Sequence, residues 1–333
     1  MTASREVRLA RRPVGAPQPS DFEVAEAQVA ALSSGEVQVR NAWMSVDPYM
    51  RGRMYDRPSY VPPFEVGKVM QGGAVGRVTA SSDPGFREGD LVSSMFGWRE
   101  SFNARAEHLQ KLDAHGLPEQ AFLGVAGMPG MTAWAGLLKV AAMKEGDVVF
   151  VSAAAGAVGQ VVCQIARLKG ASRVIGSAGG AEKGEWLREI GCDEVIDYKA
   201  EPDLNAALAR AAPKGIDVYF ENVGGEHLVA ALNAARPFAR FAMCGSISGY
   251  NAEKPEPGPP NLMLTVGKRL RLQGFIVSDF FGDQPEFVRE MTGWIQGGQV
   301  RWKETVDEGI DAAPGAFMKL FKGENLGKML VKL

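Results

Sequence analysis

The chain reads E-G-D-V-V-F-V-S-A-A-A-G-A-V-G-Q-V-V-C-Q-I-A-R-L-K-G from Glu145 to Gly170, which is a turn, a buried strand, a glycine-rich bend and a helix. The bend at 154–159 fits the pattern G-x-G-x-x-G with alanine in the first position. Gly156 would let the backbone approach a pyrophosphate, and Gly159 would let the helix pack close to the strand. The helix N-terminus carries unpaired N–H groups that attract phosphates. This stretch predicts a nicotinamide dinucleotide site.

Strands and helices alternate on both sides of this bend, from about residue 126 onward. Such alternation is typical of a Rossmann, doubly wound parallel sheet in an α/β fold. Strands are expected at 148–152, 173–177, 194–196, 217–222, 238–244 and 269–277, and helices at 157–169, 181–190, 203–212, 226–235 and 284–297.

The first 125 residues have a different pattern, with short apolar runs separated by Gly, Pro and Asp. The runs at 36–41, 69–78 and 90–95 predict strands of a partly closed antiparallel barrel. A length of 333 residues favours two domains. We expect a β-rich domain over 1–125, completed by 300–333, and a nucleotide-binding domain over 126–299.

The composition narrows the class of protein. A net charge of −2, from 37 basic and 39 acidic side chains, gives no wide basic face for nucleic acid. No apolar run approaches the roughly 20 residues that span a bilayer. The three cysteines, Cys163, Cys192 and Cys244, show no C-x-x-C spacing and none lies near a histidine in the sequence. We therefore expect a cytoplasmic protein without a disulfide framework or a cysteine–histidine zinc site.

The end of the second Rossmann strand indicates which dinucleotide is bound. NAD-specific sites place an acidic residue there to hold the ribose hydroxyls. This chain has G-S-A-G-G at 176–180 instead. Lys183 and Tyr198 could supply a charge and a hydroxyl to a 2′-phosphate. The alternative for Lys183 is a solvated surface lysine, but the missing acid favours NADP(H).

These residues and several further motifs resemble the zinc-independent branch of the medium-chain dehydrogenase/reductases. Within that branch the chain is similar to leukotriene/prostaglandin reductases, alkenal double-bond reductases and curcumin reductases. The motifs are S-V-D-P-Y-M-R-G at 45–52, G-M-P-G-M-T-A-W at 127–134, A-A-G-A-V-G at 154–159, E-N-V-G-G at 221–225, C-G-S-I-S-G-Y-N at 244–251, L-Q-G-F-I-V-S-D at 272–279 and E-N-L-G-K-M at 324–329.

The resemblance implies a GroES-like β-barrel catalytic domain beside the Rossmann domain, and it implies a set of cofactor contacts. Without it, Asn222 and Asn325 would be interpreted as turn or capping residues. The implied contacts are Gly156, Ala157, Val158, Gly159 and Gln160 at the pyrophosphate, Lys183 and Tyr198 at the 2′-phosphate, and Asn222, Cys244, Gly245, Ser246, Ile247, Tyr250, Phe275, Ile276, Val277 and Asn325 around the nicotinamide half.

The resemblance also indicates the chemistry. Zinc-dependent relatives carry G-H-E where this chain has P-F-E-V-G-K-V-M at 63–70, so no metal is expected and zinc-type alcohol oxidation is disfavoured. Reduction of an activated C=C bond requires only that the charge developing on the carbonyl oxygen be stabilised. Tyr250 is the candidate hydroxyl, with a loop tyrosine that only packs its ring as the alternative.

The expected substrate is a hydrophobic enone or enal. Tyr49, Tyr60 and Met128 are the preferred lining residues, and further aromatic candidates are Trp43, Phe96, Phe280 and Phe281. The proline-rich stretch 249–260 is either a connector or a lid. Two other functions remain open, a zinc-free quinone reductase and a non-catalytic NADP-binding sensor. The resemblance further implies a homodimer formed through the nucleotide-binding domain.

Overall fold

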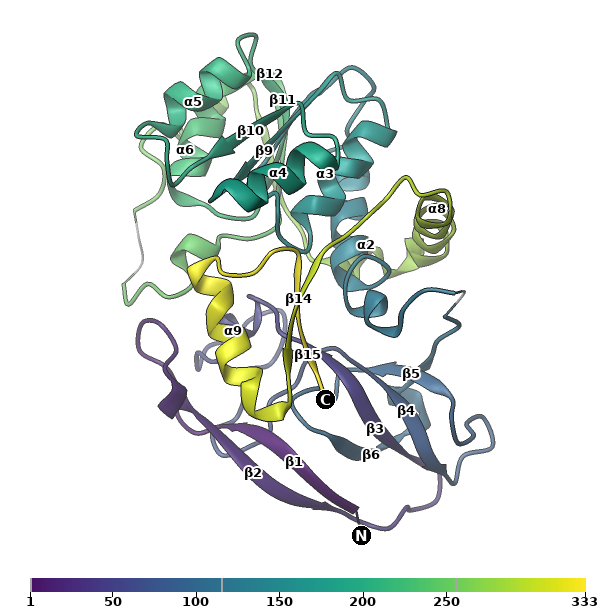
Figure 1. The fold of residues 1–333 in the computed structure, drawn as a ribbon. Coiled ribbons are helices and arrows are strands. Elements are labelled where there is room, and N and C mark those ends of the chain that lie inside the picture. The colour runs from purple at the N-terminus through teal and green to yellow at the C-terminus, as the bar shows by residue number, and fades with distance from the viewer. Residues whose placement is uncertain (1, 115, 255–256) are drawn as a thin grey trace. The chain divides into compact units, whose positions relative to one another are not determined.

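The computed structural model describes residues 2–114, 116–254 and 257–333, so residues 255 and 256 of the proline-rich stretch lie outside the described part. The chain forms two compact units (Figure 1). The first contains residues 1–123, 304–325 and 329–333, and the second contains residues 124–303 and 326–328. Within the described residues no helix is long and apolar enough to cross a membrane.

The second unit is built on a six-stranded sheet in the order β10-β9-β8-β11-β12-β13. Every pairing in it is parallel. The strands are β8 (Val148–Val151), β9 (Arg173–Ala178), β10 (Glu194–Asp197), β11 (Ile216–Glu221), β12 (Ala235–Met243) and β13 (Arg271–Gly274). The helices are α2 (Met128–Ala135), α3 (Gly159–Leu168), α4 (Ala181–Glu189), α5 (Leu204–Ala211), α6 (Gly225–Ala234), α7 (Leu264–Gly267) and α8 (Gln284–Gln296).

Strands β8, β9 and β11 are buried almost throughout, because helices cover both faces of this sheet. Phe150, Ile175 and Tyr219 form one core with residues of α5 and α6. Since parallel crossovers are right-handed, the connections through α3 and α4 lie on the other face, in front of the strands in Figure 1. The Rossmann-type α/β fold predicted from the sequence is confirmed.

Two expectations for this unit need correction. The strand predicted at 269–277 is confined to β13, and Phe275–Val277 leave the sheet and lead into a short 3₁₀ segment, Val277–Asp283. Among the described residues β13 is the last strand in the sheet order, and no further strand pairs with its outer side. Helix α2 was not predicted, because its apolar residues are mostly buried and show little helical amphipathicity.

The first unit contains a separate antiparallel sheet in the order β14-β15-β3-β4-β5-β7, with β6 paired to β3, and a β1–β2 hairpin. The strand predicted at 69–78 begins later, at Ala74, and Gly72 before it lies close to the Met50 side chain. The elements are β1 (Thr2–Leu9), β2 (Phe22–Val29), β3 (Glu36–Ser45), α1 (Met50–Arg53), β4 (Ala74–Ser81), β5 (Leu91–Ser94), β6 (Ser101–Arg105), β7 (Gln110–Lys111), β14 (Glu304–Glu308), α9 (Ala313–Lys322) and β15 (Lys328–Lys332).

The core of the first unit joins the two ends of the chain. Phe317 of α9 is fully buried and packs edge-on against Trp98 and Phe22, with ring centroids 6.0 and 6.2 Å away. Edge-to-face aromatic contacts of this kind add to the free energy gained by burial. The C-terminal helix is therefore part of the same core as the N-terminal strands.

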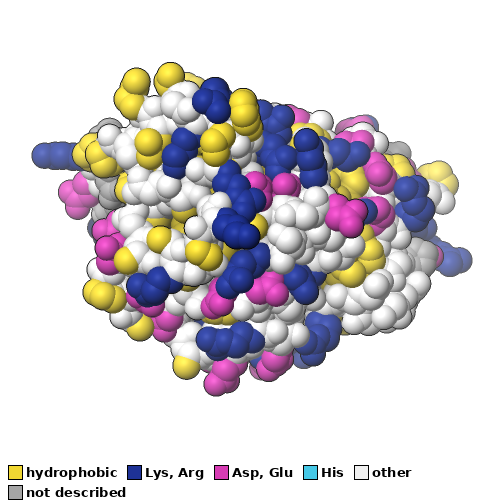
Figure 2. Space-filling model, turned by 90° about the horizontal axis from the view of Figure 1, so that it is seen from above, with side chains coloured by type: hydrophobic (Ala, Val, Ile, Leu, Met, Phe, Trp, Pro, Cys, Tyr) yellow, Lys and Arg dark blue, Asp and Glu magenta, His cyan; other side chains and the backbone are white. Residues whose placement is uncertain are grey.

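The surface carries mixed charge. Lys and Arg side chains run through the middle of the face in Figure 2, with Asp and Glu side chains among them. In the first unit, Arg5, Arg8 and Arg11 form ion pairs with Glu100, Glu6 and Asp21. The N-terminal arginines are thus locally neutralised.

Candidate dinucleotide-binding crevice

The strand order of the parallel sheet reverses direction between β8 and β11. From β8 the chain moves outward through β9 to β10, then returns to β11 on the other side of β8. Connections leave the carboxyl ends of β8 and β11 in opposite directions, which opens a crevice there. Ligands of open α/β folds bind at this position.

The bend after β8 depends on very close backbone contacts. A Cβ at Gly159 would overlap the carbonyl oxygen of Ala153 and would lie 2.6 Å from the Cα of Ala154, so only glycine lets α3 begin there. Ala153 itself has a φ of 45°. At Gly156 a Cβ would lie 3.2 Å from the Ala153 oxygen, which is tight but not prohibitive. The bend thus brings the N-terminus of α3 to the crevice, with no side chain on Gly156 or Gly159 to cover the backbone.

Gln160, which the motif places at the pyrophosphate, is held by several hydrogen bonds. Its side chain is buried, its Nε2 donates to the carbonyl of Lys303 at 3.2 Å, and its Oε1 accepts from Trp186 Nε1 at 3.1 Å. Its backbone N–H donates to the Gly156 carbonyl. Its side chain therefore links α3 to α4 through Trp186.

Gly327 is a further part of the bend that the sequence analysis did not identify. Its N–H donates to the carbonyl of Ala155 at 2.8 Å, and the residue forms a bridge to Gly156. A Cβ at Gly327 would overlap the carbonyl oxygen of Lys303. The motif E-N-L-G-K was noted for Asn325, but in the structure its glycine supports the bend after β8.

Positive charge gathers at the carboxyl end of β9. Residues 176–180 carry no acidic side chain there. The pKa of Lys183 in the first turn of α4 is lowered, mainly by burial and then by the positive charge of Lys199. Two ammonium groups held near each other are a suitable site for a dianion. This end of the crevice fits the 2′-phosphate of NADP.

Tyr198 is held beside this charge by a buried histidine. The ring of His227 on α6 meets the Tyr198 ring edge-on, with centroids 5.3 Å apart. His227 Nε2 also shares a hydrogen bond of 2.9 Å with the Ser177 hydroxyl at the end of β9. Burial lowers the pKa of His227 to about 4, so the imidazole is neutral at pH 7. Neither Ser177 nor His227 was singled out from the sequence.

A buried carboxyl group, Glu221, connects the ends of β8 and β11. Its Oε1 accepts hydrogen bonds from the Ser152 hydroxyl at 3.0 Å, the Val223 N–H at 2.7 Å and the Gly224 N–H at 2.9 Å. Within the described residues its Oε2 has no hydrogen-bond partner. Burial raises the pKa of Glu221, while the bonds from the two backbone N–H groups act in the opposite direction.

Asn222 and Cys244 lie directly beside this carboxyl group. The Asn222 amide donates to the Ser152 carbonyl at 2.7 Å, and the Cys244 N–H donates to the Glu221 carbonyl at 3.0 Å. Burial, with a smaller effect from Glu221, raises the pKa of the Cys244 thiol to about 12, so the thiol is neutral. The structure therefore brings these two predicted residues together at the ends of β11 and β12.

Tyr250 folds back over the same region. Its hydroxyl oxygen accepts a hydrogen bond from the Ser246 N–H at 3.3 Å, and a Cβ on Gly245 would lie 3.0 Å from it. The Ile247 N–H in turn donates to the Asn222 carbonyl at 3.1 Å. Because the phenol oxygen accepts from the backbone, its own proton can be directed to another acceptor.

The remaining residues predicted to contact the cofactor lie in two different parts of the chain. The Phe275 ring packs against the rings of Phe220 and Phe280, with centroids 6.3 and 6.2 Å away, and Ile276 and Val277 follow it out of the sheet. Asn325 lies in the segment 304–325 of the first unit, two residues before Gly327.

The substrate candidates in the first unit gather around the short helix α1. Tyr49 precedes α1, and its pKa is raised, mainly by burial and then by Asp47, so it keeps its proton. Arg53 at the end of α1 lies over the Phe64 ring and donates to the Pro62 carbonyl at 2.9 Å. Tyr60 is 62% exposed.

The other residues predicted to line the substrate site differ in their exposure. Met128 is exposed at the N-terminus of α2 in the second unit, and Phe281 is exposed as well. Phe96, however, stacks on Phe102 at 4.8 Å beside a core cluster of the first unit, and Trp43 packs against another. These packing contacts account for both aromatic rings without a substrate.

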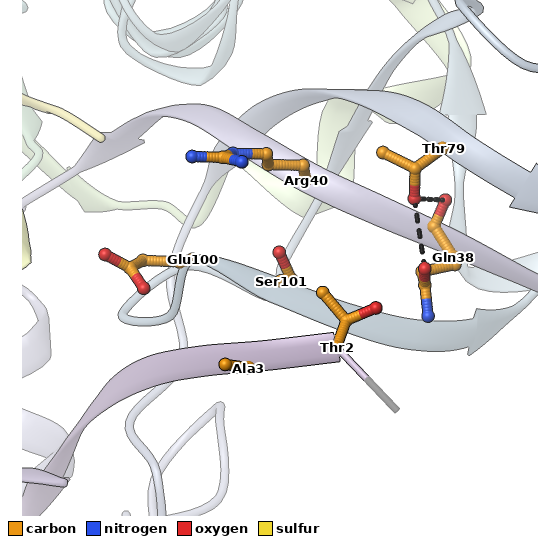
Figure 3. Close-up of a pocket in the computed structure, with 7 residues that line it drawn as sticks. All are labelled: Thr2, Ala3, Gln38, Arg40, Thr79, Glu100 and Ser101. Atoms are coloured by element: carbon orange, nitrogen blue, oxygen red, sulfur yellow. Dashed lines mark hydrogen bonds between the residues drawn. The ribbon is translucent and has the colours of Figure 1, made fainter. Parts of the chain in front are cut away.

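One described pocket contains no predicted site residue. Its volume is about 200 Å³, and it lies in the first unit between β1, β3, β4 and the start of β6 (Figure 3). Polar side chains such as Gln38, Thr79 and Glu100 line it, and Thr79 donates to the Gln38 side chain at 3.3 Å. Within the described part of the chain no group of three or more His, Cys, Asp or Glu could hold a metal ion.

The raised pKa of Glu221 predicts how stability depends on pH. The folded state retains the proton more strongly than the unfolded state, so the free energy of unfolding falls as pH rises from the unfolded pKa through the folded one. Glu221→Gln keeps an acceptor for the three donors and removes the charge. We expect its thermal midpoint to decline less than that of the wild type between about pH 4 and 7. Exposed Glu226→Gln is the control, and parallel pH profiles for all three proteins would contradict this assignment.

Comparison with known proteins agrees with this architecture. Residues 5–112 match the family model described as the N-terminal domain of oxidoreductase, and residues 157–295 match the model described as zinc-binding dehydrogenase. The NADPH-dependent curcumin reductase of Escherichia coli is 45% identical over 331 residues, covering 98% of this chain and 95% of its own. The NADP(+)-dependent 2-alkenal reductase of Nicotiana tabacum is 42% identical over 335 residues, covering 99% and 97%.

A solved structure gives the same result. The crystal structure of CurA from Vibrio vulnificus in complex with NADPH superposes with a TM-score of 0.94 at 41% sequence identity, over 98% of each chain. Identity at this level over nearly the whole length shows the family as well as the fold. The chain belongs to the zinc-independent medium-chain dehydrogenase/reductases.

Proposed function

We propose that this protein is an NADPH-dependent reductase of the C=C bond of α,β-unsaturated aldehydes and ketones. The observation that carries the proposal is the placement of the Tyr250 hydroxyl over Gly245, where it accepts from the Ser246 N–H. A phenol in this position can donate its proton to an oxygen held at the end of β12. The names of the relatives, a curcumin reductase and a 2-alkenal reductase, support the same class of substrate.

The residues present fit NADP(H) as the cofactor. The crevice is cationic near Lys183 and Lys199, lacks an acid over 176–180, and keeps the Cys244 thiol protonated. Lys183 and Tyr198 would hold the 2′-phosphate, the first turn of α3 the pyrophosphate, and Asn222 with residues 244–247 the nicotinamide half. When bound, NADPH supplies the hydride.

The protein's part in the reaction is to orient the substrate and stabilise charge. A new C–H bond forms at the β-carbon, the electron pair of the C=C bond moves toward the carbonyl, and negative charge develops on its oxygen. Tyr250 would hydrogen-bond that oxygen as the charge develops. A proton then adds to the α-carbon, from Tyr250 or from water. Tyr49, Tyr60 and Met128 would contact the hydrophobic body of the substrate.

A small panel of substrates tests this function against its alternatives. We expect NADPH oxidation with 2-nonenal and a chalcone-like enone, with saturated aldehyde or ketone as the product, and no oxidation of a simple secondary alcohol with NADP. Turnover of a quinone alone would instead favour the zinc-free quinone reductase. Tight binding of NADPH without any turnover would favour the non-catalytic sensor.

Tyr250→Phe tests the role of the hydroxyl. Loss of one oxyanion donor lowers kcat by about 10²-fold to 10³-fold. We expect a fall of that order for enone reduction with little change in NADPH affinity, because the ring that covers Gly245 remains. Tyr55→Phe, near Arg51 in the first unit, is the matched control. A Tyr250→Phe rate within about twofold of the wild type would show that the oxyanion is stabilised elsewhere.

We also propose that the protein is a homodimer joined through the second unit. β13 ends the sheet order and leaves one side of its backbone for pairing. Exposed apolar side chains lie close by in the chain, with Phe238 65% and Val266 67% exposed. We expect a dimer mass by light scattering, and a monomer for Val266→Asp. Val306→Asp in the first unit is the control, and a wild-type monomer would contradict the proposal.

A further inference from the structure

We propose that Lys199 is a third ligand of the 2′-phosphate and a determinant of the preference for NADP over NAD. The inference rests on the proposed function, which assigns Lys183 and Tyr198 to that phosphate and leaves Lys199 without a role. It follows from the position of the Lys199 side chain beside Gly179, from its closeness to the Lys183 charge, and from the lack of an acidic side chain over 176–180.

The turn after β10 directs Lys199 back toward β9. The Lys199 N–H donates to Asp197 Oδ1 at 3.0 Å, and the Ala200 N–H donates to the Asp197 carbonyl at 3.0 Å. The aliphatic part of Lys199 then crosses Gly179. A Cβ on Gly179 would lie 2.8 to 2.9 Å from the Cγ, Cδ and Cε atoms of Lys199. Glycine at this position therefore leaves the space that the lysine stem occupies.

This path brings the Lys199 ammonium group near the start of α4. Gly179 is two residues before Ala181, the first residue of that helix, and Lys183 lies in its first turn. The charge of Lys199 lowers the pKa of Lys183, second only to burial. Within the described residues Lys199 forms no ion pair. Bringing two like charges together is unfavourable unless an anion neutralises them.

The chemistry of the two dinucleotides differs at this place. A phosphate monoester carries about −1.5 to −2 charges at pH 7, whereas the NAD ribose presents a neutral hydroxyl. Loss of the Lys199 charge should therefore weaken NADP binding and leave NAD binding almost unchanged. Tyr198, adjacent in the chain and fixed by His227, would add a hydrogen bond to the same phosphate.

Isothermal titration with fragments of the cofactor tests the proposal without catalysis. The probes are adenosine 2′,5′-bisphosphate and adenosine 5′-monophosphate, which differ only in the 2′-phosphate. For Lys199→Gln we expect the Kd of the bisphosphate to rise about tenfold, as for the loss of one charged hydrogen bond. The Kd of the monophosphate should stay within about twofold. Lys199→Arg should restore most of the affinity.

Two controls separate this inference from the function on which it rests. Lys214→Gln removes a charge from the turn before β11 and should change neither Kd. Gly179→Ala keeps every charge but displaces the Lys199 stem, so it should weaken bisphosphate binding selectively. A Lys199→Gln protein that still prefers the bisphosphate as strongly as the wild type would overturn the role of Lys199 alone. A wild type that binds both probes equally would overturn the 2′-phosphate site itself.

Discussion

The crevice of the second unit depends on one buried carboxyl group. Glu221 ends β11, and its Oε1 accepts from the Ser152 hydroxyl after β8 and from two N–H groups of the following turn. Three donors share this one acceptor, and leaving a buried donor unpaired would cost about 1–3 kcal/mol. The bonds join the two strands between which the sheet reverses direction. Asn222 and Cys244 are bonded directly to this junction, and Tyr250 is bonded to Ser246 in the segment that follows Cys244.

The crevice has different electrostatics at its two ends. At the Glu221 end, burial raises the pKa of the carboxyl group and of the Cys244 thiol, and the thiol keeps its proton. At the end of β9 the ammonium groups of Lys183 and Lys199 add positive charge, and His227 stays uncharged between Ser177 and Tyr198. A ligand with an uncharged ring at one end and a phosphate at the other matches this distribution. The same gradient orients such a ligand along the carboxyl edge of the sheet.

Most of the parallel sheet could be predicted because each of its signals is local. Four buried residues in a row followed by a glycine bend and an apolar helical stripe predict β8 and α3 whatever surrounds them. Prediction failed where packing against residues distant in the chain decides where an element ends. β13 stops at Gly274 although the apolar run continues, and the rings of Phe220 and Phe280 take up the Phe275 side chain instead. The β1–β2 hairpin was missed because its charged residues obscure the alternation that buries Val7 and Leu9.

By itself the amino-acid sequence determined the fold class, the family and the kind of cofactor, since these follow from ordered motifs and from the missing acid at 176–180. Tertiary structure alone decided which polar groups share a site. Glu221 and Ser152 are 69 residues apart, and Ser177 and His227 are 50 apart, yet each pair is hydrogen-bonded. No sequence window contains such pairs. They arise because a parallel sheet brings the carboxyl ends of strands distant in the chain to one edge.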